Sequence, residues 1–224
     1  MPIVPAAAFR KEVGRDDYAA WLYEGDWVIG KVLEALESHH LADRTLVIAT
    51  SDNGANQRVY PPLRGCKRTI YEGGHRVPFL ARWPGKIKAG SVSHDPVCLN
   101  DLMATCAEIL EATLPPDAGE DSVSILPDLL GVAKGPVRET TVHQSPAGDL
   151  AIREGSWKLI FFRNGQRELY NLRTDPSEGQ EIARHHPDVV ERLATRMQQQ
   201  LKFGRSTPGP TQKNAVEVML DRRQ

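Results

Sequence analysis

An apolar run rich in β-branched residues, TLVIAT at 45–50, constrains the fold of this chain more than any other feature. Its length and lack of polar alternation are typical of a strand that is buried on both faces of a parallel sheet. In the preceding segment, 16–38, the apolar residues fall on one face of a helix, and Asp16 or Asp17 can cap its start. A helix followed by a buried strand predicts an α/β fold.

The segments that follow predict a long loop and then more α/β structure. Residues 51–77 lack periodicity, and a loop of this length is usually functional. Residues 78–83 predict another strand, and 100–112 predict a helix. The inward residues of that helix are expected to be Leu102, Cys106, Ile109 and Leu110.

The pattern changes to short alternating segments after Gly135. Strands are predicted at 140–144, 150–154, 157–162 and 168–171. Residues 187–203 predict a closing helix that begins at a proline and ends at Gly204. We therefore expect part of a mixed, mostly parallel sheet flanked by helices over 1–134, and a small antiparallel sheet packed with a helix over 135–204. Residues 205–224 are expected to form a disordered tail.

Composition excludes several classes of protein. The net charge of -1 gives nucleic acid no electrostatic reason to bind. No apolar stretch approaches the roughly 18 residues that a membrane span needs, and no signal peptide is expected at the start. Three cysteines without a C-x-x-C spacing disfavour a disulfide framework and a zinc site, and we expect Cys98 and Cys106 in the core.

Asp52 and Asn53 directly follow the predicted buried strand. Open α/β sheets place their ligand sites outside the carboxyl ends of such strands. A carboxylate beside an amide oxygen suits Ca²⁺ or Mg²⁺ and is poor for zinc. The alternative is a simple turn, because Asp-Asn-Gly is a common turn sequence.

Three cations, Arg64, Lys67 and Arg68, lie within five residues on the long loop. Such a cluster can hold an oxyanion by charge and hydrogen bonding, although a solvated surface loop explains the same charges. The Glu72-Gly73-Gly74 stretch adds backbone that can approach a ligand closely.

Two long segments in order carry a resemblance to a known family: TLVIATSDNG at 45–54 and PLRGCKRTIYEGGHRVPFLARWPGKIKAG at 62–90. They closely resemble the second half of the sulfatase catalytic domain, in the alkaline phosphatase superfamily. AIREGSWKLI at 151–160 and ELYNLRTDPSEGQEIA at 168–183 resemble the C-terminal subdomain of that family. The resemblance implies that residues 1–134 form the C-terminal half of the catalytic domain.

The resemblance also implies roles for individual residues. Asp52 and Asn53 occupy the positions of the ligands of a divalent cation, usually Ca²⁺. Lys67 holds the position of the lysine that contacts the sulfate group of the substrate. The expected partner is thus a sulfated small molecule or carbohydrate. Related enzymes are often periplasmic or secreted, but the residues of this chain leave the compartment of a longer parent open.

The chain also departs from the family pattern. It has no C-x-P-S-R segment, in which the family's cysteine or serine is oxidised after synthesis to the formylglycine nucleophile, and it lacks the acidic pair that the family carries near its N-terminus. Cys66 and Arg68 stand where glycine is frequent in the family. We therefore expect formylglycine only in a full-length parent, and little or no activity from this chain alone.

Two histidines are candidates near the site. His143 ends a predicted strand and is expected on the substrate side, whereas a structural or surface role is expected for His75.

Two alternative functions remain open: a phosphonate or phosphate ester hydrolase of the same superfamily, and a non-catalytic binding protein that keeps the fold. The ELYNLRTDPSE segment favours a sulfatase. An exposed sheet edge is expected to promote self-association.

Overall fold

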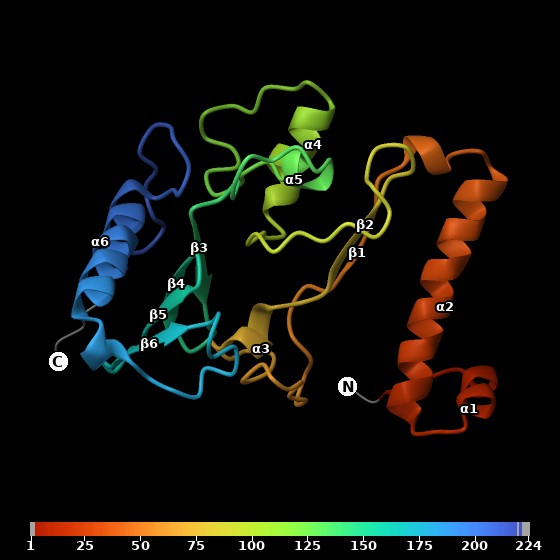
Figure 1. The fold of residues 1–224 in the computed structure, drawn as a ribbon, viewed down its shortest axis with the longest axis horizontal. Coiled ribbons are helices and arrows are strands. Elements are labelled where there is room, and N and C mark those ends of the chain that lie inside the picture. Colours follow the sequence, from red (N-terminus) through yellow and green to blue (C-terminus); the bar gives the residue numbers. More distant parts are fainter. Residues whose placement is uncertain (1–2, 219, 221–224) are drawn as a thin grey trace. The chain divides into compact units, whose positions relative to one another are not determined.

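The computed structural model describes residues 3–218 and 220, and these residues form two compact units. The first unit comprises the described residues up to Ala49 together with Phe79–Ala89. The second comprises Thr50–Pro78 and the described residues from Gly90 onward. Figure 1 shows the elements of both units along the chain.

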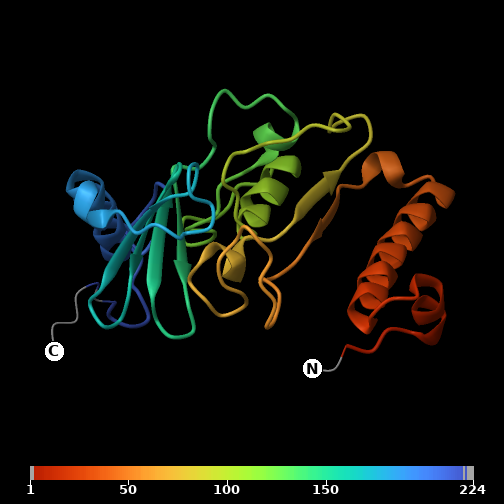
Figure 2. The same cartoon turned by 60° about the horizontal axis from the view of Figure 1, so that its bottom comes forward.

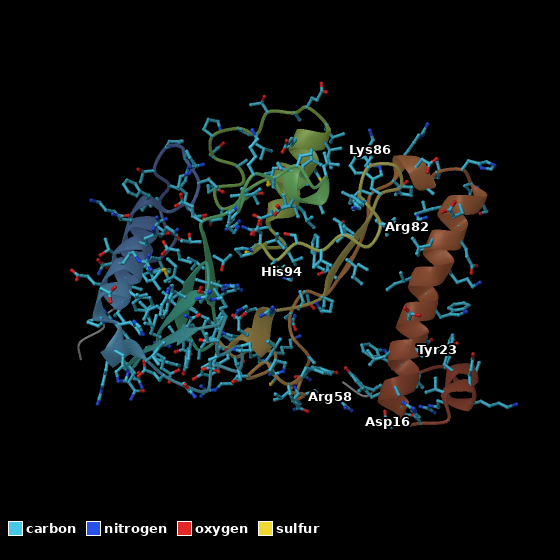
Figure 3. The ribbon with its side chains drawn as sticks, viewed as in Figure 1. Asp16, Tyr23, Arg58, Arg82, Lys86 and His94 are labelled. Atoms are coloured by element: carbon cyan, nitrogen blue, oxygen red, sulfur yellow. The ribbon has the colours of Figure 1, made fainter. Side chains whose placement is uncertain are left out.

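The first unit is mainly helical. Its elements are α1 (Ala7–Val13), α2 (Asp17–Ser38), the 3-10 helix η1 (Ala42–Arg44) and the strands β1 (Val47–Thr50), which belongs to this unit up to Ala49, and β2 (Phe79–Arg82). As expected, Asp16 caps α2: its Oδ1 accepts a hydrogen bond from the Ala19 amide at 2.8 Å. Figure 3 shows Asp16 at this end of the helix and Tyr23 further along it.

Helix α2 leaves most of its apolar side chains uncovered. Seven of its large apolar residues are 41–50% exposed: Trp21, Leu22, Tyr23, Trp27, Val28, Ile29 and Val32. Phe9 of α1 packs edge-on against the rings of Tyr23 and Trp27. Because Ala20 is the one buried residue of α2, contacts within the described residues bury little of its predicted apolar face.

Strands β1 and β2 pair with each other in a two-stranded sheet. The expectation that the 45–50 strand is buried on both faces is wrong for this structure, because three of the four β1 residues are half-buried and Thr50 is exposed. The physical reason is that only β2 pairs with β1 among the described strands. The α/β class and the small antiparallel sheet are observed, whereas a mostly parallel sheet is not seen in this part of the chain.

The second unit holds the remaining elements. They are α3 (Glu72–His75), α4 (Asp101–Ile109), α5 (Leu126–Leu129), β3 (Thr140–Gln144), β4 (Leu150–Glu154), β5 (Trp157–Phe161), β6 (Arg167–Asn171), η2 (Ala183–His185) and α6 (Pro187–Phe203). The strands form an antiparallel sheet in the order β3-β4-β5-β6, as the alternating pattern predicted. Helix α6 has the predicted bounds, and Gly204 at φ 64° ends it in the left-handed conformation.

Each face of this sheet packs on a different segment. One face carries Ile152, Leu159 and Leu169 in register and packs on α6 through Leu193 and Met197. The other face packs Ala151, Ile160, Tyr170 and the neighbouring Leu172 against Ile70 of the long loop. Figures 1 and 2 show α6 on one side of the sheet and α3 on the other. The sheet therefore connects the closing helix to the loop.

The inward face of α4 differs from the predicted one. Asp101 and Thr105 are buried, whereas Cys106 and Leu110 are exposed. The polar residues lie inward because their oxygens are used: the Asp101 carboxylate pairs with Arg138, and Thr105 Oγ1 accepts the Ile125 amide at 3.0 Å. Cys106 is thus not a core residue, and Cys98 is half-buried.

The predicted tail has structure in its first part. Arg205 donates hydrogen bonds to the carbonyl oxygens of Thr207 and Pro116, and the Gln212 amide bonds Phe203. Leu220 is buried in the cluster under α6. Residues 219 and 221–224 of the predicted tail lie outside the described residues. Across the part of the chain that the structure describes, no helix has the length and apolarity of a membrane span.

Replacing Leu193 by alanine should destabilise the second unit, because this fully buried side chain joins α6 to the sheet. The expected loss in the free energy of unfolding is about 2–5 kcal/mol, from the lost transfer free energy and the cavity left behind. Urea denaturation followed by circular dichroism measures it. Gln199→Ala on the exposed face of the same helix is the control and should change stability by less than about 0.5 kcal/mol.

Candidate functional site

The long loop places Asp52 and Asn53 directly after β1. The Asp52 side chain is exposed and that of Asn53 is half-buried. The Ser51 hydroxyl bonds the Asn53 carbonyl at 3.0 Å, which fixes the backbone. Neither the Asp52 carboxylate nor the Asn53 amide group has a hydrogen-bond partner among the described residues, so both are free to bind a ligand.

Glycines hold the two ends of this loop together. The Gly54 amide donates to the Gly74 carbonyl at 2.9 Å, and the Lys67 amide donates to the Ala55 carbonyl at 3.0 Å. A Cβ atom at Gly54 would lie 1.8 Å from the Gly73 oxygen, and one at Gly74 would lie 2.1 Å from the Thr69 oxygen. Only glycine permits this backbone packing. It brings Lys67 next to the residues that follow Asn53.

The three predicted cations have different surroundings. Arg64 NH1 donates to the Glu178 carbonyl at 2.8 Å and to the Tyr170 hydroxyl at 3.2 Å, and its guanidinium lies 3.8 Å from the centre of the Tyr71 ring. Arg64 is therefore committed to the C-terminal sheet. The Lys67 ammonium and the Arg68 guanidinium form no ion pair with any residue that the structure describes.

Polar residues of the sheet hold the loop on the face opposite α6. Lys158 of β5 pairs in register with Arg153 of β4 and Tyr170 of β6, so these three side chains share one face. His143 of β3 pairs with Ala151, and Glu168 of β6 pairs with Ile160. Ala151 and Ile160 pair with each other and lie two residues from Arg153 and Lys158, so His143 and Glu168 are on the same face. The Glu168 carboxylate accepts the hydroxyls of Tyr170 at 2.7 Å and of Tyr71 at 3.0 Å.

The strongest link between loop and sheet is a buried ion-pair cluster. Lys158 Nζ lies 3.0 Å from Glu72 Oε1 and 2.7 Å from Glu178 Oε1. All three side chains are at most 2% exposed. Glu178 Oε2 also accepts the Glu72 amide at 2.7 Å, so it binds both α3 and the lysine. Arg153 lies 3.6 Å from Glu72 and completes the positive side of the cluster.

The cluster shifts the two carboxyl groups in opposite directions. Burial by itself raises the pKa of Glu72, but the hydrogen bond from His75 and the charge of Lys158 more than offset it, and the pKa falls well below its usual range. Burial raises the pKa of Glu178, and the Lys158 ammonium only partly offsets this. One lysine thus holds one firmly ionised carboxylate and one that protonates more readily.

His143 stacks on His75, with ring centroids 3.8 Å apart. His75 Nε2 lies 3.2 Å from Glu72 Oε1, which gives it the structural role expected from the sequence. Burial, and then the nearby charges of His75 and Lys158, lower the pKa of His143 to about 3. The Nδ1 atom of His143 is buried and has no hydrogen-bond partner among the described residues, although part of the residue reaches the surface.

The oxygen atoms of Asp52 and Asn53 are the type of ligand that a hard divalent cation prefers, but two residues are too few to fill its coordination shell. Carboxylate and amide oxygens suit Ca²⁺ or Mg²⁺, and Ca²⁺ takes six to eight oxygen ligands. Among the described residues, no group of three His, Cys, Asp or Glu side chains is placed to hold a metal ion. These two residues would therefore supply only part of a coordination shell.

The sequence interpretation missed the residues that hold the loop to the sheet: Glu72 as a side chain, Arg153, Lys158 and Glu178. One signal was present, since Lys158 interrupts the otherwise apolar run WKLIFF at 157–162. A lysine inside a buried strand needs a carboxylate partner. The sequence pattern did not identify which carboxylates these are.

Two family models match this chain, and together they cover the loop and the C-terminal sheet. Residues 6–112 match the Sulfatase family. Residues 66–206, more than half of the chain, match the family described as N-sulphoglucosamine sulphohydrolase, C-terminal. The chain belongs to the sulfatase family, whose members are sulfuric ester hydrolases.

Curated relatives cover most of this chain. It is 34% identical to an N-acetylgalactosamine-6-O-sulfatase of Bacteroides thetaiotaomicron over 87% of this chain and 43% of the relative. It is 32% identical to human arylsulfatase A over 86% of this chain and 40% of the relative. The chain thus spans less than half the length of these relatives.

Solved structures share the fold. One, from work on the metabolism of multiple glycosaminoglycans by Bacteroides thetaiotaomicron, is 32% identical with a TM-score of 0.79, over 89% of this chain and 47% of that one. Another, solved in complex with its substrate D-glucosamine-2-N,6-O-disulfate, is 27% identical with a TM-score of 0.70, over 83% of this chain and 40% of that one.

The His143 environment predicts a pH dependence of stability. Because the folded pKa is lowered, the unfolded chain takes up a proton below about pH 6.5 while the folded chain does not, so stability is lost as the pH falls toward 3. Between pH 7 and 5 this histidine should remove about 2 kcal/mol from the free energy of unfolding. Urea denaturation at both pH values measures the loss.

The His143→Gln variant should lack this part of the pH dependence. His185→Gln, at an exposed histidine, is the matched control and should keep the wild-type slope. Equal slopes for wild type and His143→Gln would contradict the assignment.

Proposed function

We propose that this chain is the C-terminal half of a sulfuric ester hydrolase that acts on a sulfated carbohydrate. One observation carries the proposal: two unpartnered oxygen donors, Asp52 and Asn53, and an unpaired cation, Lys67, lie on one glycine-packed loop. In the proposed organisation, residues 1–134 belong to the catalytic domain and 135–204 form the subdomain that holds the loop. In a longer protein, β1 would join a larger, mostly parallel sheet.

Asp52 and Asn53 are the proposed ligands of Ca²⁺, with Mg²⁺ as the alternative ion. Their oxygens are uncommitted to protein partners, and water or other protein oxygens would complete the shell. A bound divalent cation supplies Lewis-acid polarisation of a sulfate oxygen.

Lys67 and His143 are the proposed substrate-binding residues. The Lys67 ammonium would pair with a sulfate oxygen, which stabilises the negative charge on that group. His143 stays neutral near pH 7 because its pKa is lowered, so the part of the residue that reaches the surface can contact a substrate without adding a charge. The stack on His75, next to Gly74 and hence Gly54, supports a position near the metal ligands.

The nucleophile is not among these 224 residues, because no C-x-P-S-R segment is present. We propose that a longer protein supplies a formylglycine and that this chain alone does not turn over sulfate esters. The relatives named N-acetylgalactosamine-6-sulfatase support a sulfated amino sugar as the substrate class. The exposed apolar residues of α2 support self-association of the isolated chain.

Calorimetric titration with Ca²⁺ tests the metal site. The wild-type chain should bind Ca²⁺ weakly, with Kd on the order of 10⁻⁴–10⁻³ M, because few protein ligands are present. Asp52→Ala should abolish binding. Asp117→Ala, at an exposed aspartate distant in sequence, is the control and should bind as wild type does. Binding that persists in Asp52→Ala would place the ion elsewhere.

Kinetics in a longer protein that contains these residues test Lys67. Lys67→Ala should lower kcat/KM for an aryl sulfate about 10²–10³-fold, because a cation facing the developing charge is lost. Arg68→Gly is the matched control: it removes the neighbouring charge at a backbone φ of 78°, which glycine adopts without strain. Equal losses in the two variants would show that only the general positive charge of the loop matters.

A further inference from the structure

The buried cluster of Glu72, Lys158 and Glu178 is unused by the proposed chemistry. Removing an ammonium and two carboxylates from water is costly, and an apolar trio of similar volume would often be no less stable. Burial of these groups at 0–2% exposure therefore gives little reason for the cluster in terms of stability alone. A charge network differs from apolar packing in one respect: its ion pairs and hydrogen bonds are directional and form in one geometry only.

The geometry that it selects is that of the site loop. Lys158 lies on β5, the second strand from the β6 edge, while Glu72 begins α3 and Glu178 follows β6. Glu178 accepts the Glu72 amide at 2.7 Å, and the next amide, Gly73 N, donates to the Arg64 carbonyl at 2.8 Å. The hydrogen bond that closes the turn 64–73 therefore comes from Gly73, directly after the Glu72 residue that pairs with Lys158.

The same turn holds the proposed ligands. Gly74, two residues after Glu72, accepts the Gly54 amide, and Lys67 within the turn donates its amide to the Ala55 carbonyl. Asn53 immediately precedes Gly54. A continuous set of contacts therefore runs from Lys158 through Glu72 and α3 to the backbone that carries Asp52, Asn53 and Lys67.

We propose that Lys158, acting through Glu72 and Glu178, is a positioning residue that lets the C-terminal sheet set the geometry of the metal and sulfate site. The inference rests on the proposed function of Asp52 and Lys67. It assigns Lys158 of the C-terminal subdomain a role in ligand binding that this side chain performs without touching the ligand.

The test is a neutral triple variant of this chain, Glu72→Gln, Lys158→Met and Glu178→Gln. It keeps the side-chain volumes and leaves no buried charge unpaired within the trio. We expect cooperative unfolding to persist, the Kd for Ca²⁺ to rise about tenfold or more, and the amides of 52–57 and 63–76 to exchange with deuterium about tenfold faster. Amides of β4 and β5 should keep their protection.

A second buried ion pair of the same unit provides the matched control. Arg138→Met with Asp101→Asn removes the Arg138–Asp101 pair, which lies between α4 and β3 and, among the described residues, forms no hydrogen bond or ion pair with the loop 51–77. This double variant should retain both the Ca²⁺ affinity and the exchange of the loop. A merely structural cluster would affect overall stability in both variants and would leave the Ca²⁺ affinity of the folded triple variant unchanged.

Two readouts separate this inference from the proposed function. If the wild-type chain binds no Ca²⁺, the proposed metal site is wrong for this chain. The role of Lys158 is then tested by deuterium exchange of the loop amides alone. Wild-type exchange of the loop in a folded triple variant overturns it. If the triple variant loses cooperative unfolding, Glu178→Gln alone decides, because it keeps the Lys158–Glu72 pair and an acceptor for the Glu72 amide. Faster loop exchange in that variant supports the inference, and unchanged exchange overturns it.

Discussion

The Lys158 ammonium, buried between two carboxylates, is the interaction that holds the site loop to the C-terminal sheet. It comes from the middle of a β-sheet, where an unpaired charge would be strongly unfavourable. Its partners come from segments about 85 residues before it and 20 residues after it in the chain. Each partner carboxylate also uses its own hydrogen-bonding capacity, so the cluster constrains α3, β5 and the segment after β6 at once.

The two faces of the C-terminal sheet make different kinds of contact. One is apolar and packs on α6, which supplies the stabilisation expected from buried aliphatic side chains. The other combines a small apolar cluster with Arg153, Lys158, Glu168 and His143, and it holds the loop by directional contacts. Apolar packing thus stabilises the subdomain, while polar contacts hold the loop on which Asp52, Asn53 and Lys67 lie.

Local patterns predicted the elements well where a segment contained its own signal. Helix α6 has the predicted bounds because its proline start, apolar face and glycine stop are all local. The four strands of the small sheet were likewise predicted within a residue or two. The inward face of α4 was predicted wrongly, because Asp101 and Thr105 satisfy polar groups far away in the chain that periodicity does not reveal.

The sequence by itself determined the family, the positions of Asp52, Asn53 and Lys67 on one loop, and the order of the elements. All three conclusions depend on the types and spacing of residues that are neighbours in the chain. Only the tertiary structure decided that Arg64 is committed to the sheet, that His143 stacks on His75, and that Lys158 meets Glu72 and Glu178. The physical reason is that buried charges are matched through space, and the sequence shows that a partner is needed without showing which residue provides it.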